Sequence, residues 1–272
     1  MHGPLQMFIR SLHPFLKKTS NVCLSTQRRR ALSNGSFVRQ LFEQTTSTYT
    51  YIIADGKSRE AFIIDPVITT VARDMQIIKQ LGLTLRYAIN THVHADHITG
   101  SGRLKTLLPE CRSVISKCSG GKADIYIEHG DEIEIGEKND KNQRLVLECR
   151  STPGHTNGCM TFVWHKGASV FTGDCLLIRG CGRTDFQQGS ADKIYTSIYE
   201  HIYTLPDHFI VYPGHDYTGQ TSSTVAEEKQ FNSRLLKSRE DFVKFMKELK
   251  LSYPLQIDKA LPANLVCGLV DP

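Results

Sequence analysis

The sequence lacks several features that would place the protein in a membrane or in a disulfide-rich class. No stretch approaches the ~18 consecutive apolar residues of a membrane-spanning helix, so no membrane span is predicted. None of the eight cysteines forms a Cys-x-x-Cys motif, and free, mostly buried thiols fit this usage better than a disulfide scaffold. No low-complexity linker interrupts residues 40–272, so we expect one compact domain over residues 37–272.

Acidic residues are absent from the first 42 positions, which contain seven arginines and lysines. The rest of the chain has 26 basic and 28 acidic residues, so the formal charge of +5 belongs to this leader and does not indicate nucleic-acid binding. An acid-free leader with arginine, serine and leucine is typical of a mitochondrial or plastid transit peptide. We therefore predict a transit peptide at residues 1–36, the alternative being a disordered basic tail.

The strongest signal is a dense group of histidines. The apolar run Leu85–Ile89 predicts a buried strand, and His92, His94, Asp96 and His97 follow it within a few residues. Side chains alternate in an extended segment, so several of these groups can face one cleft. Imidazole and carboxylate are preferred ligands of transition metals. The density favours a metal site over the alternative of solvated surface residues.

Predicted strands alternate with helices along the whole domain. Strands are expected at 46–53, 60–64, 85–89, 114–116, 125–127, 131–135, 144–149, 160–165, 168–172 and 209–212. Helices are expected at 71–81, after residue 98 and around 194–202, and two capping boxes (Thr224 with Glu227, Ser238 with Asp241) predict two short C-terminal helices followed by a tail. Hairpins with separated helices favour two packed sheets with helices outside, an α+β fold.

Metal-binding residues recur where these strands end. Four predicted strands end at such a residue: His92, His155, Asp174 and His215. Groups placed repeatedly at strand ends are expected to converge on one rim of the packed sheets, so the sequence predicts that these four form one site.

The motifs around these residues resemble a known superfamily. His92-x-His94-x-Asp96-His97, with Pro153–His155, Thr172–Asp174 and Pro213–His215, resembles the metallo-β-lactamase superfamily. This resemblance implies an αββα sandwich. The loop 180–189, the segment 212–217 and the tail 262–268 are similar to the persulfide dioxygenases, the mitochondrial branch that acts in hydrogen sulfide catabolism. We therefore expect the protein in the mitochondrial matrix.

The resemblance also implies a metal, its ligands and a reaction. One Fe²⁺ per chain is expected on His92, His155 and Asp174, a two-histidine-one-carboxylate set that suits oxygen chemistry. The remaining metal-binding side chains are expected close by, orienting ligands and waters: His94, Asp96, His97 and His215. The implied reaction converts glutathione persulfide and O₂ to sulfite and glutathione, and a homodimer is expected by resemblance alone.

Three further residues are candidates for contact with the substrate. Arg183 is expected to hold its negative charge, since arginine pairs bidentately with carboxylates; the alternative is a structural pair with Asp185. Tyr217 is a candidate hydrogen-bond donor. Cys267 could approach the mouth of the site, the alternative being a buried, unreactive thiol. Asp65 is predicted to brace the histidine loop without binding metal.

Two other functions remain open at this point. The first is a hydroxyacylglutathione hydrolase of the glyoxalase II type with a binuclear zinc centre, for which enough potential ligands are present. The short C-terminal region disfavours it, because such hydrolases carry a larger helical domain. The second is a non-catalytic protein stabilised by a metal.

Overall fold

Two six-stranded sheets, with helices on their outer faces, make up the fold. The computed structural model describes residues 35–137 and 143–269; the predicted transit peptide falls outside them except for its last two residues. The first sheet runs in chain order: β1 (Phe37–Glu43), β2 (Thr48–Ala54), β3 (Glu60–Ile64), β4 (Thr84–Ile89), β5 (Arg112–Ser116) and β6 (Ile125–Ile127). The second has the order β12 (Ser223–Thr224), β11 (Ile210–Pro213), β10 (Ser169–Gly173), β9 (Met160–Trp164), β8 (Leu145–Ser151) and β7 (Glu132–Ile135).

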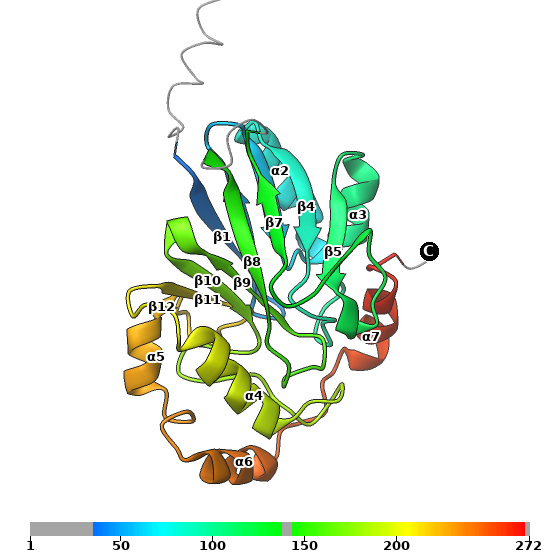
Figure 1. Cartoon of the computed structure of the whole chain (residues 1–272). Helices are drawn as coiled ribbons and strands as arrows, with labels where there is room; N and C mark the ends of the chain where they lie inside the picture. Colours follow the sequence, from blue (N-terminus) through cyan, green and yellow to red (C-terminus); the bar gives the residue numbers. More distant parts are fainter. Residues whose placement is uncertain (1–34, 138–142, 270–272) are drawn as a thin grey trace, which may run out of the picture. The chain divides into compact units, whose positions relative to one another are not determined.

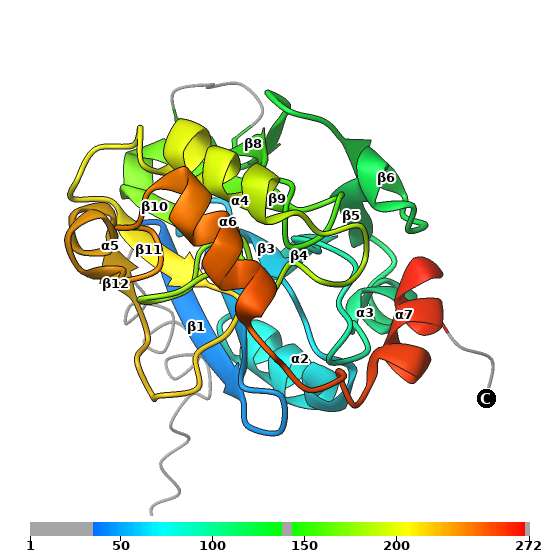
Figure 2. The same cartoon turned by 90° about the horizontal axis from the view of Figure 1, so that it is seen from below.

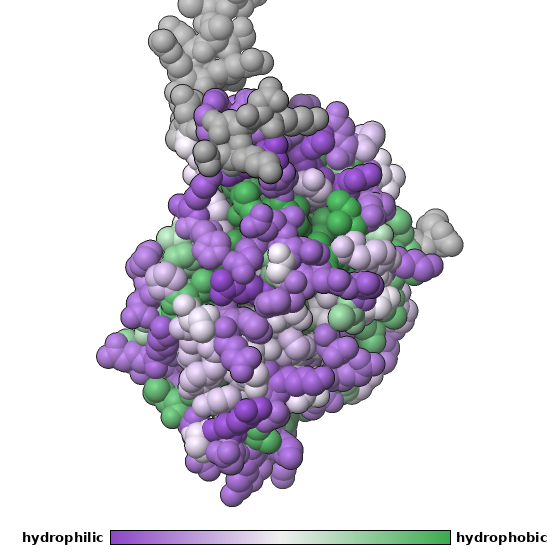
Figure 3. All heavy atoms as spheres, in the orientation of Figure 1, coloured by the Kyte–Doolittle hydropathy of each residue, from purple (hydrophilic) through white to green (hydrophobic). Residues whose placement is uncertain are grey.

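The helices cover the outer faces of the two sheets, as Figures 1 and 2 show. They are α2 (Val71–Gln80), α3 (Ser101–Leu107), α4 (Ala191–Ser197, continued by a π-helical turn Ile198–Ile202), α5 (Val225–Phe231), α6 (Arg239–Glu248) and α7 (Ile257–Leu265), with single 3-10 turns at Ile68–Thr70, Lys117–Ser119 and His165–Gly167. The αββα sandwich and the α+β class are thus confirmed. No helix in the described residues is long and apolar enough to cross a membrane, and the face in Figure 3 carries mainly hydrophilic residues.

Three apolar clusters hold the layers together. The central one lies between the sheets and includes the buried rings of Tyr51, Phe62 and Phe162. A second packs α2 and α3 onto the first sheet, and a third packs α4 and α6 onto the second sheet. Because both sheets are anchored on both faces, the loops at their ends rest on a rigid base.

Three elements differ from the sequence prediction: the strands β1 and β12 and the helix α7. Strand β1 was not predicted, since Arg39 and Gln40 interrupt its apolar pattern; it pairs along its whole length with β2. The segment predicted as a tail after two short helices contains a third helix, α7, with Pro262 inside it. Proline has no N–H to donate and disfavours a helix interior, so its presence argued against a helix that tertiary packing nevertheless forms. Both predicted N-caps, Thr224 and Ser238, are confirmed.

Candidate metal centre

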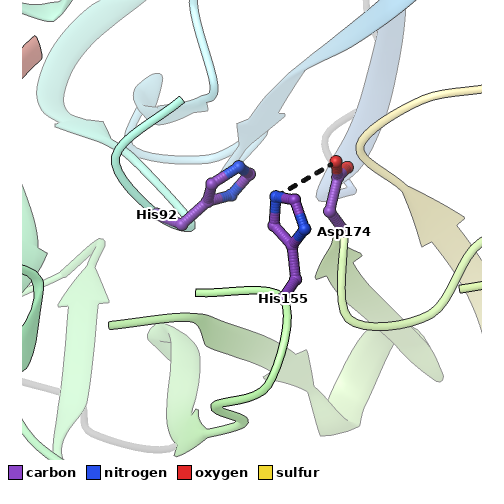
Figure 4. Close-up of side chains that lie close together, drawn as sticks. All are labelled: His92, His155 and Asp174. Atoms are coloured by element: carbon purple, nitrogen blue, oxygen red, sulfur yellow. Dashed lines mark ion pairs between the residues drawn. The ribbon is translucent and has the colours of Figure 1, made fainter. Parts of the chain in front are cut away.

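Strand direction brings the candidate ligands to one edge of the sandwich. Strands β3 to β6 run parallel, as do β10 and β11. His92 lies just after β4, His155 after β8, Asp174 after β10 and His215 after β11. One donor atom from each of His92, His155 and Asp174 lies within 4.8 Å of the others, and Figure 4 shows the three side chains pointing toward a common point.

Asp65 and Thr91 fix the orientation of His92. Asp65, at the end of β3, accepts from the Thr91 backbone N–H (2.7 Å) and hydroxyl (2.8 Å). Since that hydroxyl donates to Asp65, it accepts from His92 Nδ1 at 2.9 Å. His92 Nε2 is left buried without a hydrogen-bond partner. Burial, and then the neighbouring His94 and His155, hold the pKa of His92 well below its usual value. A neutral, buried imidazole with an unpaired lone pair fits a metal ligand.

The other two predicted ligands are oriented in the same way. His155 donates from Nδ1 to the Arg183 carbonyl at 2.7 Å, which leaves Nε2 facing Asp174 Oδ2 at 3.6 Å. His215 donates from Nδ1 to Asp174 Oδ1 at 2.6 Å, so one carboxylate oxygen is held and the other is free. Burial by itself raises the pKa of Asp174, but His215 and then His155 lower it below the usual range. Asp174 is therefore ionised and offers its second oxygen to a cation.

A second group of donors lies beside the first. His94, Asp96 and His97 also bring one donor atom each within 4.8 Å of one another. His94 Nε2 is paired with Asp65 at 3.0 Å, which leaves Nδ1 unpaired. His215 Nε2 lies 2.9 Å from Asp96, so this histidine links the two groups through Asp96 and Asp174. The four side chains expected to orient the ligands thus lie next to the first donor group, and three of them, His94, Asp96 and His97, could hold a second cation.

Close backbone approach positions His155. Gly154, directly before it, has φ +143°, and a Cβ there would lie 2.3 Å from the Ile194 nitrogen of α4. A Cβ at Gly182 would lie 2.4 Å from the Asp174 carbonyl oxygen and 2.9 Å from His155 Nδ1. Glycine at these positions lets the loop after β8 and the loop 180–189 close around the ligands.

A cavity of about 560 Å³ opens onto the centre, with Asp96, His155, Asp174 and His215 in its wall. Arg183 lines it, but its guanidinium also pairs with Asp185 at 2.6 and 2.7 Å. The structural pair considered from the sequence is therefore present.

The remaining candidates divide between the cavity and the core. Tyr217 lies in the cavity wall, largely exposed, with its ring parallel to His215 at 6.1 Å between ring centres. Cys267 is buried, its backbone carbonyl accepts from the Gly102 N–H of α3, and it is not among the residues that line this cavity. The structure thus brings Arg183 and Tyr217 to the centre and leaves Cys267 away from it.

Sequence reasoning missed two cations in the cavity wall, Arg179 and Arg234. Arg234, between α5 and α6, lines the cavity and donates to the Cys181 carbonyl at 3.0 Å. Among the described residues it has no carboxylate in ion-pair contact, whereas Arg179 pairs with Glu228. Nothing in the local sequence marks Arg234, because its position depends on how the helical region folds over the second sheet.

Comparison with known proteins shows which family the chain belongs to. Residues 45–215 match the family model of the metallo-beta-lactamase superfamily. The chain is 56% identical over 235 residues to the mitochondrial persulfide dioxygenase ETHE1 of Bos taurus, covering 86% of this chain and 90% of the relative. The crystal structure of ETHE1 from Myxococcus xanthus aligns with TM-score 0.80 and 46% identity, covering 86% of this chain and 100% of that one. The cytoplasmic hydroxyacylglutathione hydrolase of Arabidopsis thaliana is 30% identical over 62% of this chain and 64% of its own length.

Proposed function

The chain belongs to the metallo-beta-lactamase superfamily and, within it, to the persulfide dioxygenases, and from this premise we propose that one Fe²⁺ on His92, His155 and Asp174 supports its reaction. The protein is an enzyme that oxidises a persulfide with O₂. The observation that carries the iron proposal is the unpaired, buried Nε2 of His92 facing His155 and Asp174. Two imidazole nitrogens and one carboxylate oxygen match ferrous iron with open positions.

The substrate proposed is glutathione persulfide, which is converted with O₂ and water to glutathione and sulfite. Iron held by these residues would supply a redox centre that passes electrons from the persulfide sulfur to O₂, because the direct reaction of O₂ with a closed-shell sulfur is spin-forbidden.

Side chains and carbonyls of this chain orient the proposed ligands, and side chains in the cavity wall are proposed to neutralise the charge of the substrate. Thr91 and the Arg183 carbonyl fix which nitrogen of each histidine faces the centre. His215 holds one oxygen of Asp174, so the other keeps its direction. Arg183 and Tyr217, both in the cavity wall, are proposed to contact the anionic substrate there.

The proposal is tested with protein purified without oxygen. Wild-type protein is expected to retain one iron per chain and to consume O₂ when glutathione persulfide is added. His155→Ala removes one of three ligands, so iron content and O₂ consumption should both fall to background while the fold persists. Normal O₂ consumption by this variant would show that His155 is not a ligand.

The hydrolase reading keeps one specific observation in its favour, the second donor group of His94, Asp96 and His97. The hydroxyacylglutathione hydrolases are distant relatives of this chain, so we place this function second. Two zinc ions per chain with hydrolysis of S-lactoylglutathione would support it.

The protein is mitochondrial, as its relatives are named. We propose further that residues 1–36 are the transit peptide, that residues 37–272 form the mature domain in the matrix, and that this domain forms a homodimer.

A further inference from the structure

The loop that carries the first histidines is held by side-chain amides from distant parts of the chain. We call residues His92–Thr99 the metal loop. Gln187 Nε2 donates to the Val93 carbonyl at 2.7 Å. Asn264 Nδ2 donates to the carbonyls of His94 (2.8 Å) and His97 (2.7 Å). These carbonyls have no strand or helix partner, so their hydrogen bonds depend on these two side chains.

Asn264 directs three side-chain hydrogen bonds to this loop. Besides its two donors, its Oδ1 accepts from the Thr99 N–H at 2.8 Å, and the side chain is 3% exposed. Only an amide of this length supplies two donors and an acceptor at one point. The contact spans 165 to 170 residues of sequence, so it joins the C-terminal end of the fold to the loop of the metal centre.

The backbone at the end of α7 and just beyond it packs against the end of the metal loop and the segments next to it. The Leu265 carbonyl accepts from the Lys122 N–H at 2.9 Å, and the Cys267 carbonyl from the Gly102 N–H at 3.0 Å. Gly268 has φ +70°, and a Cβ there would lie 2.2 Å from the Thr99 carbonyl oxygen. Both views place α7 beside α3 (Figures 1 and 2). The tail is therefore seated directly on the end of the metal loop.

We propose that Asn264 is a positioning residue of the metal centre, through which the C-terminal segment 257–268 holds the metal loop in its ligating conformation. The inference rests on the proposed metal site at His92. His94 is fixed from two sides, since Asp65 pairs with its ring and Asn264 with its carbonyl. His92 lies two residues before His94. If the carbonyls of His94 and His97 lose their hydrogen bonds, the Nε2 of His92 can move away from the other proposed ligands. Partners that orient metal ligands are typically worth about 10–100-fold in metal affinity.

Two substitutions separate positioning from space filling. Asn264→Ala removes all three hydrogen bonds. Asn264→Asp keeps the shape and the acceptor but turns oxygen toward the His94 and His97 carbonyls. If positioning by donors is the role, both variants should lose Fe²⁺ or Co²⁺ to a competing chelator about 10-fold more readily than wild type, and the Asp variant should be no better than the Ala variant. If Asn264 only fills space, the Asp variant should retain metal as well as wild type does.

Phe242→Leu provides the control for general destabilisation. Phe242 is buried in α6 against Tyr195, outside the metal loop. Its loss of packing should lower Tm without changing metal affinity. The visible spectrum of the Co²⁺-loaded protein, which reports ligand geometry, should change in the Asn264 variants and stay unchanged in Phe242→Leu. Equal chelator sensitivity of the Asn264 and Phe242 variants at matched Tm would overturn the proposal.

A measurement on wild-type protein covers the case in which the variants do not fold. Coupling is reciprocal, so if the tail stabilises the metal loop, metal binding must stabilise the tail. Hydrogen exchange in peptides covering 257–268 should slow when Fe²⁺ is added, although none of these residues is a ligand. Unchanged exchange in a protein that has bound metal would refute the coupling. Failure of wild-type protein to bind any metal would instead refute the proposed function.

Discussion

The hydroxyl of Thr91 determines which ring nitrogen of His92 faces the proposed metal site. It stands between the Asp65 carboxylate and His92 Nδ1, and its donor is used on the carboxylate. The imidazole therefore has to present Nε2 to the centre. The resemblance to the superfamily implied His92, His155 and Asp174 as ligands and Asp65 as a brace, and the order of strands and motifs predicted only that the donors converge. The sequence could not predict Thr91, Arg234 or Asn264, since their roles depend on contacts that only the folded chain creates.

Thr91→Val is expected to weaken metal binding about 10–100-fold. The substitution keeps the shape but leaves His92 Nδ1 and one Asp65 oxygen buried without a partner, which should also cost about 1–3 kcal/mol of stability. Chelator competition and thermal unfolding measure the two effects. Thr161→Val, which removes another buried hydroxyl bonded to Thr152, should lower stability only; comparable metal loss in both variants would contradict the orienting role of Thr91.

Substitution of Arg183 tests whether its pair with Asp185 is purely structural. If Arg183 also holds the substrate's negative charge, Arg183→Met, which removes the cation, should raise KM for glutathione persulfide about tenfold, the effect of losing a charge-assisted contact of about 1.5 kcal/mol. Metal content should stay at the wild-type level, since only the Arg183 carbonyl contacts His155. Asp185→Asn, which breaks the same pair and keeps the cation, should leave KM close to wild type. Equal KM changes in the two variants would assign Arg183 to structure alone.

Among the elements, the strands were predicted better than the C-terminal helices. Alternating or continuous apolar runs marked the two hairpins and the buried strand β4, which the structure confirms. Helix α7 was missed because Pro262 opposes a helix locally, and its formation depends on packing and on the bonds of Asn264. In the loops between these elements, glycine is needed where another backbone segment lies too close to leave room for a Cβ atom.

Gly154→Ala is expected to disrupt the turn that presents His155. The new Cβ would meet the Ile194 backbone at 2.3 to 2.4 Å, at φ +143°, so either α4 or the ligand must move. We expect a stability loss of more than about 2 kcal/mol and reduced iron content. Gly82→Ala is the matched control, since its φ is also positive (+61°) but nothing lies within 4 Å of the new Cβ; it should cost about 1 kcal/mol and leave iron binding intact. Normal iron content in Gly154→Ala would be the contradicting result.

At the scale of the whole molecule, the fold brings donors from four separate segments to one edge of a double sheet. The superfamily and the enzyme class could be predicted from motif order. A metal site could be predicted as well, but its assignment to iron rested on the resemblance alone, since His94, Asp96 and His97 offer a second set of donors next to the first. Both sets are built from the same residue types, so ligand chemistry alone does not choose between one iron and two zinc ions.

Residues 1–36 are predicted to direct the chain into mitochondria, because the segment contains arginine and lysine but no acid. Fused to a fluorescent reporter, they should give mitochondrial signal that depends on the membrane potential. A version with Arg28, Arg29 and Arg30 changed to glutamate should stay in the cytosol. Diffuse signal from the unaltered fusion would contradict the targeting prediction.

The central claim is that three side chains hold a single redox-active metal with room for O₂ and a persulfide. It is tested most directly by measuring iron and zinc per chain in anaerobically purified protein together with O₂ consumed per sulfite formed from glutathione persulfide. The account predicts one iron per chain and one O₂ per sulfite. Two zinc ions per chain, with hydrolysis of S-lactoylglutathione and no O₂ uptake, would contradict it.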